Sequence, residues 1–322
     1  MQTVKLNNGV EMPILGYGVY LVSPEECERC VLDAISVGYR LIDTAQAYYN
    51  EEGVGNAIAK CDVPRNELFI TTKVWITNAG EEKAAASIDE SLRKLRTDYI
   101  DLLLIHQPLS DYTGTWRAME KAMRDGKVRA IGLSNFYPDR FVDMAEYAQI
   151  KPAVNQLRTN VFSQQWDAEA EMKPYGCHIM AWGPLAQGDP DLQDNSVMKT
   201  LSEKYGKTPQ QVDLRYLLQR DIIAIPKSTH IERMRQNLDV FDFSLSEEDM
   251  ESIRPLDKPQ DFRWSHRNPE LVKFLWNYDK QFNPNYCCPI KSIAYKKSCS
   301  AIVYSMAESC FVILSPCQKI DS

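Results

Sequence analysis

Short apolar segments alternate with amphipathic segments eight times along this chain of 322 residues, and this repeat limits the possible folds more than any other feature. The apolar segments are three to six residues long, as is typical of buried strands, and the segments between them have helical spacing. The predicted strands cover residues 14–18, 41–43, 69–73, 100–105, 130–134, 154–156, 178–182 and 222–226. Strands that alternate with helices in this way indicate a parallel sheet with helical crossovers.

Two parallel architectures are compatible with the alternation. A doubly wound sheet usually has about six strands, whereas eight strand–helix units that close on themselves form a TIM barrel. We therefore predict an α/β fold, a (β/α)8 TIM barrel. Ahead of the first barrel strand, Asn8-Gly9 favours a tight hairpin turn with positive φ at both residues. This N-terminal β-hairpin is expected to close the bottom of the barrel.

Several predicted helices have recognisable signals at their ends. Ser23-Pro24 followed by two glutamates is typical of a capped helix start, and Gly38 is typical of a helix end. Ser246 followed by three acidic residues predicts another start, because acids are favourable at the positive end of the helix dipole. Further helices are predicted over residues 84–95, 116–124, 138–149, 197–205 and 209–218.

Composition excludes several classes of protein. The net charge of −7 argues against a general nucleic-acid binder. No run reaches the roughly 18 apolar residues of a membrane-spanning helix, and the first 25 residues lack the pattern of a signal peptide. We therefore expect a cytoplasmic monomer with no nucleic-acid or membrane partner.

The last 42 residues differ from the rest of the chain. They contain five of the nine cysteines and have a net charge of +2, which leaves −9 for residues 1–280. We predict a barrel domain over residues 1–280 and a divergent, Cys-rich C-terminal tail over residues 281–322. The tail is interpreted either as a disordered extension or as a lid or partner-binding segment.

A residue with a polar head lies at the end of every predicted strand from the second to the eighth. In a TIM barrel these ends meet at one face, where the loops build the active site. The residues are Asp43 with Tyr48 in the following loop, Lys73, His106, Ser134 with Asn135, Gln156, Trp182, and Lys227 with Ser228. Their convergence predicts one site at the C-terminal end of the barrel.

An acid, a phenol, an amine and an imidazole at one site indicate proton-transfer chemistry. The lysine cation at position 73 would lower the pKa of Tyr48, and Asp43 would keep that lysine charged and in place. His106 would orient a carbonyl group by donating a hydrogen bond. None of these side chains is a redox group, so hydride transfer would require a bound cofactor.

Eight segments together resemble the aldo-keto reductase family, over roughly residues 3–276. The pattern is most similar to the shorter microbial and protozoan, diketogluconate-reductase-like members. The segments are Gly16-Tyr17-Gly18; Ile42-Asp43-Thr44-Ala45-Gln46-Ala47-Tyr48 with Asn50-Glu51; Thr72-Lys73-Val74-Trp75; Asp101-Leu102-Leu103-Leu104-Ile105-His106; Ile131-Gly132-Leu133-Ser134-Asn135-Phe136; Val154-Asn155-Gln156; Ala181-Trp182-Gly183-Pro184-Leu185; and Ile225-Pro226-Lys227-Ser228.

The resemblance implies reduction of aldehydes and ketones to alcohols, by hydride transfer from the nicotinamide of NADPH to a small carbonyl substrate. Tyr48 would be the proton donor in a catalytic set of Asp43, Tyr48, Lys73 and His106. The resemblance further implies cofactor-binding roles for Gly18, Val19, Ser134, Asn135, Gln156, Trp182, Gly183, Pro184, Leu185, Gln187, Lys227, Ser228, Arg233, Gln236 and Asn237, and a substrate pocket formed by Tyr20, Trp75 and Gln107. Lysine and arginine at the phosphate of the adenosine ribose would favour NADPH over NADH.

Two departures from the family pattern lie near the expected substrate. Gln107 replaces an aromatic residue that usually lines the pocket, and Arg158 lies where an acid is common. The alternative function is an NADPH-binding, redox-sensing or structural barrel without significant turnover; a barrel isomerase or aldolase would need a different acid–base set. No metal site is expected, because Cys27 and Cys30 lie in a predicted amphipathic helix without a second pair.

Overall fold

The computed structural model describes residues 2–259, 263 and 265–283, so the predicted tail lies outside the described residues except for residues 281–283. The strands are β1 (Thr3–Lys5), β2 (Glu11–Pro13), β3 (Tyr17–Gly18), β4 (Leu41–Asp43), β5 (Phe69–Val74), β6 (Ile100–Ile105), β7 (Val128–Ser134), β8 (Val154–Arg158), β9 (His178–Trp182) and β10 (Ile223–Ala224). The α-helices are α1 (Pro24–Val37), α2 (Glu51–Lys60), α3 (Glu81–Leu95), α4 (Tyr112–Arg124), α5 (Pro138–Tyr147), α6 (Trp166–Met172), α7 (Pro190–Asp194), α8 (Ser196–Tyr205), α9 (Pro209–Gln219), α10 (Ile231–Leu238), α11 (Glu247–Ile253), α12 (Pro269–Trp276) and α13 (Tyr278–Phe282).

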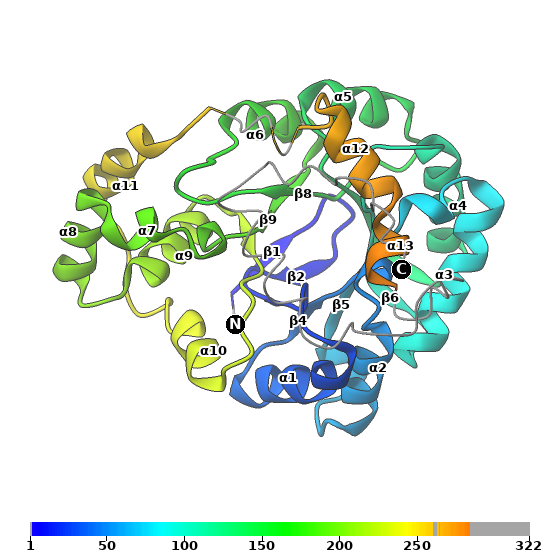
Figure 1. The fold of residues 1–322 in the computed structure, drawn as a ribbon, viewed down its shortest axis with the longest axis horizontal. Coiled ribbons are helices and arrows are strands. Elements are labelled where there is room, and N and C mark those ends of the chain that lie inside the picture. The colour runs from blue at the N-terminus through cyan, green and yellow to red at the C-terminus, as the bar shows by residue number, and fades with distance from the viewer. Residues whose placement is uncertain (1, 260–262, 264, 284–322) are drawn as a thin grey trace, which may run out of the picture. The chain divides into compact units, whose positions relative to one another are not determined.

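The eight strands β3 to β10 form one parallel sheet in sequence order, and the sheet closes on itself. Its seam joins the first and last strands: Gly16 N donates to Ala224 O at 2.8 Å, and Ala224 N donates to Ile14 O at 2.9 Å. Helices surround the sheet, as Figure 1 shows. The predicted (β/α)8 barrel is therefore confirmed.

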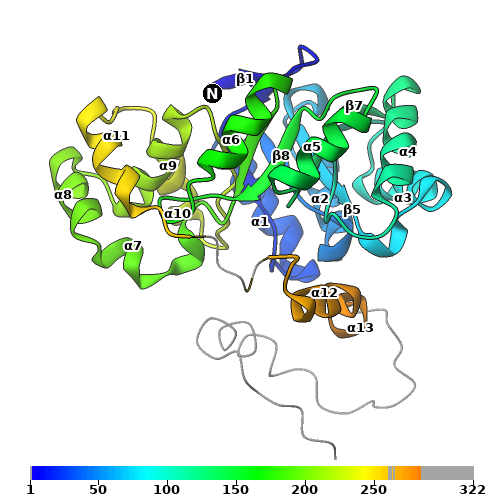
Figure 2. The same cartoon turned by 90° about the horizontal axis from the view of Figure 1, so that it is seen from above.

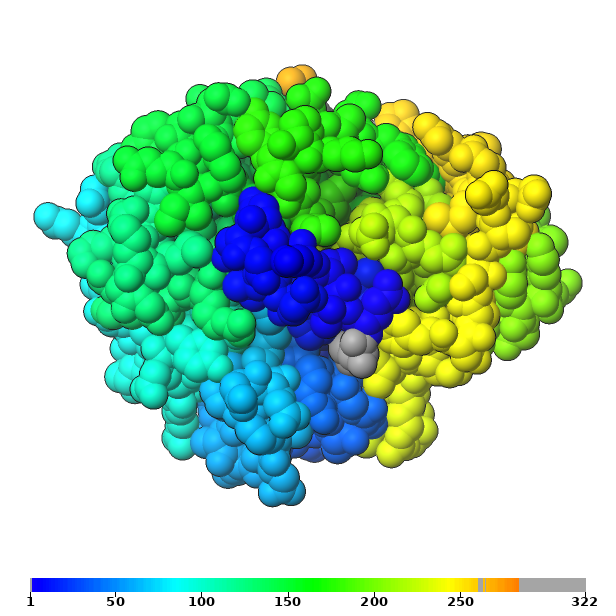
Figure 3. All heavy atoms as spheres, turned by 180° about the vertical axis from the view of Figure 1, so that it is seen from behind, coloured from blue at the N-terminus to red at the C-terminus, as the bar shows by residue number. Residues whose placement is uncertain are grey.

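The N-terminal hairpin of β1 and β2 covers one end of the barrel, where it lies over the centre of the face seen in Figure 3. The side chains of Asn7 and Asn8 attach its turn to the barrel by donating to Pro152 O and Arg129 O, both at 2.9 Å. The turn differs from the expected one, because only Gly9 has a positive φ, at 87°. Asn8 keeps an ordinary φ while its amide reaches the barrel.

The helix signals in the sequence are mostly confirmed. Ser23 accepts from Glu26 N at the start of α1, Gly38 ends that helix with φ 117°, and Ser246 forms a capping box with Asp249 at the start of α11. Helix α2 was not predicted, because it contains Gly53 and Gly55, which disfavour helices.

The two glycines of α2 are explained by packing against the helices on either side. A Cβ atom at position 53 would lie 2.7 Å from Cys27 Cβ on α1, and one at position 55 would lie 2.1 Å from the carbonyl oxygen of Lys94 on α3. Cys27 and Cys30 are fully buried in the hydrophobic core, on the inner face of α1. Among the described residues, no helix is long and apolar enough to cross a membrane.

Replacing Gly55 with Ala is expected to lower the free energy of unfolding by about 1–3 kcal/mol, because the new methyl group would press on the backbone of α3. Glu52→Ala in the same helix is the control, since its side chain is 68% exposed and its 3.6 Å ion pair with Arg93 contributes little. Urea denaturation of both variants checks the expectation. Equal midpoints for Gly55→Ala and wild type would contradict it.

Candidate active site

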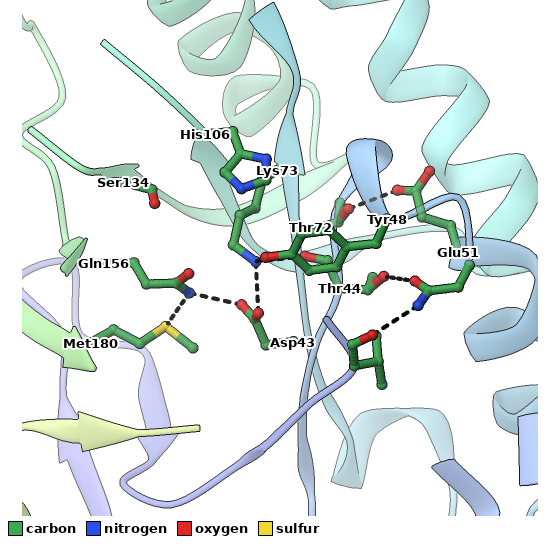
Figure 4. A network of polar contacts seen from close by, with 12 residues as sticks. Asp43, Thr44, Tyr48, Glu51, Thr72, Lys73, His106, Ser134, Gln156 and Met180 are labelled. Atoms are coloured by element: carbon green, nitrogen blue, oxygen red, sulfur yellow. Dashed lines mark hydrogen bonds and ion pairs between the residues drawn. The ribbon is translucent and has the colours of Figure 1, made fainter. Parts of the chain in front are cut away.

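Four predicted residues meet at the end of the barrel opposite the hairpin. Asp43 is the last residue of β4, Lys73 lies near the end of β5, and His106 directly follows β6. Tyr48 ends the short 3-10 helix Gln46–Tyr48 that follows β4. Figure 4 shows these side chains turned toward one another. Parallel strands deliver them to one place because all their carboxyl ends point the same way.

The ammonium group of Lys73 lies at the centre of the site and is fully buried. Its Nζ atom donates to Asp43 Oδ1 at 2.6 Å, to the backbone oxygen of Thr44 at 2.8 Å and to Tyr48 Oη at 3.3 Å. A lysine has three N–H donors, so each of them has an acceptor. This full set of partners makes a charged amine tolerable without water.

The second carboxylate oxygen of Asp43 is held from across the barrel. Gln156 Nε2 donates to Asp43 Oδ2 at 2.9 Å and lies 3.2 Å from the sulfur of Met180. The carboxylate therefore bridges Lys73 and Gln156 (Figure 4). Burial raises the pKa of Asp43 and lowers that of Lys73, while the attraction between the two groups and the hydrogen bond from Gln156 oppose the change in Asp43.

Tyr48 differs from our expectation in its acidity. We expected the Lys73 cation to lower its pKa, but burial raises that pKa well above its usual value, and Asp43 adds to the effect. Sequence alone does not show how far a phenol is buried, and Tyr48 is partly buried against the barrel core. The phenol is therefore protonated at neutral pH, with the Lys73 ammonium within hydrogen-bonding distance.

His106 lies against aromatic rings. Its ring centroid is 5.6 Å from that of Tyr48 and 5.0 Å from that of Trp75, in edge-on arrangements. Burial, and then the charge of Lys73, keep its pKa well below the usual range, so the imidazole is neutral. Among the described residues, its Nδ1 atom is buried without a hydrogen-bond partner. A neutral imidazole has one N–H donor and one acceptor, which suits it to orient a carbonyl oxygen.

Of the predicted cofactor-binding residues, Ser134, Asn135, Gln156 and Trp182 lie at or near the ends of β7, β8 and β9. Asn135 Nδ2 donates to Ser134 Oγ at 3.0 Å and to the backbone oxygen of His106 at 3.1 Å, while Trp182 Nε1 donates to Asn135 Oδ1 at 2.9 Å. Asn135 has φ 63°, a left-handed conformation that asparagine tolerates. These contacts join Ser134, Asn135 and Trp182 to one another and to the backbone of His106, one of the four residues Asp43, Tyr48, Lys73 and His106 that form the predicted catalytic tetrad.

The residues predicted to bind the adenosine phosphate follow β10 and extend into α10. Lys227 and Arg233 are exposed, and within the described part of the chain neither pairs with a carboxylate. Ser228 is buried, and its backbone oxygen accepts from Tyr17 Oη at 2.5 Å. Two unpaired cations beside a fixed loop fit a phosphate group.

The remaining predicted cofactor-binding residues lie at the ends of β3 and β9, in the segments that follow these strands, or on α10. Gly18 N donates to Pro226 O at 3.2 Å, and an added Cβ at Gly18 would lie 3.0 Å from Ile225 O, so the backbone is closely approached there. The segment after β9 turns sharply, with positive φ at Gly183 and Gln187. The other members are Val19 after β3, Pro184 and Leu185 after β9, and Gln236 and Asn237 on α10.

The three predicted substrate-pocket residues border the tetrad from different elements. The Tyr20 ring lies 5.0 Å from that of Tyr48, and Trp75 directly follows β5 and touches His106. Gln107 follows His106, and its Oε1 atom lies 2.8 Å from Nε2 of His266. Tyr20 is 41% exposed, whereas Trp75 is only 4% exposed.

Sequence reasoning missed several residues that hold this site together. Asn50 donates to the backbone oxygens of Val19 and Val22 at 2.9 and 3.0 Å and accepts from Thr44 Oγ1 at 2.8 Å, so it fixes the turn that carries Tyr48. The buried Glu51 accepts from Thr72 Oγ1 at 2.7 Å, beside Lys73 (Figure 4). Both residues belong to the segments that resemble the family, but the sequence predicts no function for either of them.

Comparisons with known proteins found similar sequences and structures. A model described as the aldo/keto reductase family matches residues 15–258. Glyoxal reductase of Bacillus subtilis is 47% identical over 260 residues, which cover 80% of this chain and 94% of that protein. Methylglyoxal reductase DkgA of Escherichia coli is 38% identical, covering 79% and 93%. The crystal structure of a Bombyx mori aldo-keto reductase in complex with NADP is 35% identical with a TM-score of 0.77, covering 81% and 94%.

Lys73→Met is expected to lower the free energy of unfolding by about 3–5 kcal/mol, because it leaves the Asp43 carboxylate buried without its cation. The double variant Asp43→Asn/Lys73→Met should recover part of that loss. Lys127→Met is the control, since its ion pair with Asp89 is 42% and 58% exposed and worth at most about 1 kcal/mol. Urea denaturation of wild type and these three variants measures the differences, and a double variant no more stable than Lys73→Met would contradict the explanation.

Proposed function

Because the chain belongs to the aldo/keto reductase family and is an NADPH-dependent carbonyl reductase, we propose that its substrates are small aldehydes and α-dicarbonyl compounds and that Tyr48 protonates the carbonyl oxygen. The observation that carries the role of Tyr48 is its protonated phenol 3.3 Å from the Lys73 ammonium. The substrate class is supported by the names of the glyoxal and methylglyoxal reductases to which the chain is similar.

The residues present fit NADPH. Lys227 and Arg233 have no carboxylate partner among the described residues and offer positive charge for a phosphate. The amide groups of Asn135 and Gln156 lie near the tetrad, where a carboxamide would be held. A Cβ atom at Gly18 would lie 3.0 Å from Ile225 O, so the backbone is closely packed there. When bound, NADPH supplies the hydride that reduces the carbonyl carbon.

Residues of the chain itself would transfer the proton to the carbonyl oxygen and stabilise the negative charge that develops on Tyr48. The neutral His106 imidazole would donate a hydrogen bond to the carbonyl oxygen and orient it toward Tyr48. Tyr48 then gives its proton to that oxygen. The phenolate that remains lies beside the Lys73 ammonium, whose position and charge are maintained by Asp43. Charge that develops on Tyr48 is therefore met by a cation already in place.

Two parts of the proposal concern the whole molecule. Cys27, Cys30, Cys61 and Cys177 are free thiols, which supports a location in the reducing cytoplasm. All the proposed catalytic residues come from one copy of the chain, so a monomer would be a complete enzyme. An NADPH-binding protein without turnover is disfavoured, because Tyr48 and Lys73 are both present and in contact.

Tyr48→Phe is expected to reduce kcat/KM for methylglyoxal by about 10²–10⁴-fold, because the variant has no proton to give. NADPH affinity, measured by fluorescence titration, should stay within about twofold, and NADPH oxidation at 340 nm measures turnover. Tyr147→Phe, a phenol on the outer surface that is 47% exposed, serves as the control. Full activity of Tyr48→Phe would rule out its role as the proton donor.

The reduction rate of wild type is expected to be flat between about pH 6 and 9. In this window His106 stays neutral, since its pKa is lowered, and Tyr48 stays protonated, since its pKa is raised. Loss of activity should begin only below the window, as His106 gains a proton, or above it, as Tyr48 loses one. A half-maximal rate near pH 6.5 that disappears in His106→Gln would show that the histidine titrates normally, contrary to the structure.

A further inference from the structure

Two buried tyrosines near the start of the chain take no part in the proposed proton transfer. Tyr17 lies on β3, and Tyr39 follows Gly38 at the end of α1; each is only 1% exposed. Their ring centroids lie 5.9 Å apart. Burial raises the pKa of both phenols, so both stay protonated and can donate a hydrogen bond. A buried phenol needs a partner for its hydroxyl group, and the partners of these two lie far along the chain.

Both hydroxyl groups donate to backbone oxygens of residues 227–238, which follow β10, include α10 and are called the phosphate segment below. Tyr17 Oη donates to Ser228 O at 2.5 Å, and Tyr39 Oη donates to Met234 O at 3.1 Å, across 211 and 195 positions of sequence. Helix α10 packs beside α1, as Figures 1 and 2 show. The two phenols therefore attach the phosphate segment to β3 and to the end of α1.

Each attached residue is the direct chain neighbour of a cation that is proposed to bind the phosphate of the adenosine ribose. Lys227 precedes Ser228, and Arg233 precedes Met234. In both pairs the cation is exposed and the attached residue is buried. Lysine and arginine have long, flexible side chains, so the place of their charge depends on how firmly the backbone beneath them is held.

Other contacts hold the rest of the phosphate segment. Ser228 Oγ accepts from the backbone nitrogen of His230 at 3.1 Å, directly before α10. At the far end of α10, Gln211 Nε2 donates to the backbone oxygen of Asp239 at 2.7 Å. The backbone is thus held at its beginning, in its middle and at its end, and the two phenols make the contacts that lie next to the cations.

We propose that Tyr17 and Tyr39 are positioning residues for the cofactor: they hold Lys227 and Arg233 where one phosphate group can contact both, and they thereby determine the preference for NADPH over NADH. This inference rests on the proposed function, in which these two cations bind that phosphate. NADH lacks the phosphate group on the adenosine ribose, so its binding does not depend on the place of the two cations. Preorganised cations increase affinity because less freedom is lost when the phosphate binds.

The test measures the Kd of NADPH and of NADH by fluorescence titration in wild type, Tyr17→Phe and Tyr39→Phe, without a carbonyl substrate. Each variant should raise the Kd of NADPH by about tenfold, which corresponds to ~1.4 kcal/mol, and change that of NADH by less than about twofold. Tyr216→Phe is the matched control. That phenol is also 1% exposed, but its hydroxyl donates at 2.8 Å to Gln164 Oε1, outside the phosphate segment, so the ratio of the two Kd values should not change.

Hydrogen exchange of the peptide over residues 228–238 gives a readout in the free enzyme. Exchange should be faster in Tyr17→Phe and Tyr39→Phe than in wild type or Tyr216→Phe. Equal exchange in all of these proteins, or an equal loss of affinity for both nucleotides in the two tyrosine variants, would overturn the inference.

Arg233→Ala distinguishes failure of this inference from failure of the proposed phosphate site. If Arg233→Ala lowers the preference for NADPH while Tyr17→Phe and Tyr39→Phe keep it, the inference is overturned and the phosphate site stands. If Arg233→Ala leaves the preference unchanged, the phosphate site is itself overturned, together with the inference that rests on it.

Discussion

The ammonium group of Lys73 is fully buried and can remain charged only because three acceptors surround it. Removing a charged group from water costs several kcal/mol, and only well-placed partners recover that cost. Asp43, Thr44 and Tyr48 therefore have to lie where they do. Their positions in turn require the exact register of β4 against β5 and the tight turn after β4. The local structure of the site is therefore determined by the hydrogen-bond acceptors that the buried Lys73 ammonium requires.

The positions of the tetrad could be predicted from the sequence because they follow a strong periodic signal. Asp43, Lys73 and His106 each lie at the end of an apolar segment, and parallel strands bring such ends together. The turn at Asn8 and the acidity of Tyr48 were not predicted correctly. Both depend on surroundings that come from distant parts of the chain, namely the backbone oxygen of Arg129 and the residues that enclose the phenol.

The contacts of Asp279 on α13 with Tyr49 and Thr77 had no sequence signal for a similar reason. Asp279 is separated from Thr77 by 202 positions and from Tyr49 by 230, and nothing in the local pattern of either segment indicates its partner. The predicted boundary at residue 280 was chosen from composition, and it falls inside α13.

The seam between the first and last barrel strands has a consequence for synthesis of the chain on the ribosome. Gly16 forms a backbone hydrogen bond with Ala224, and Asp43 accepts a hydrogen bond from Gln156. Residues synthesised early therefore form these contacts only after their much later partners have been synthesised. Until then the Lys73 amine has no closed barrel to enclose it and stays hydrated. Contacts of such long sequence separation slow folding. The nascent chain therefore carries all four tetrad residues well before the barrel can close around them, because the seam needs the last strand.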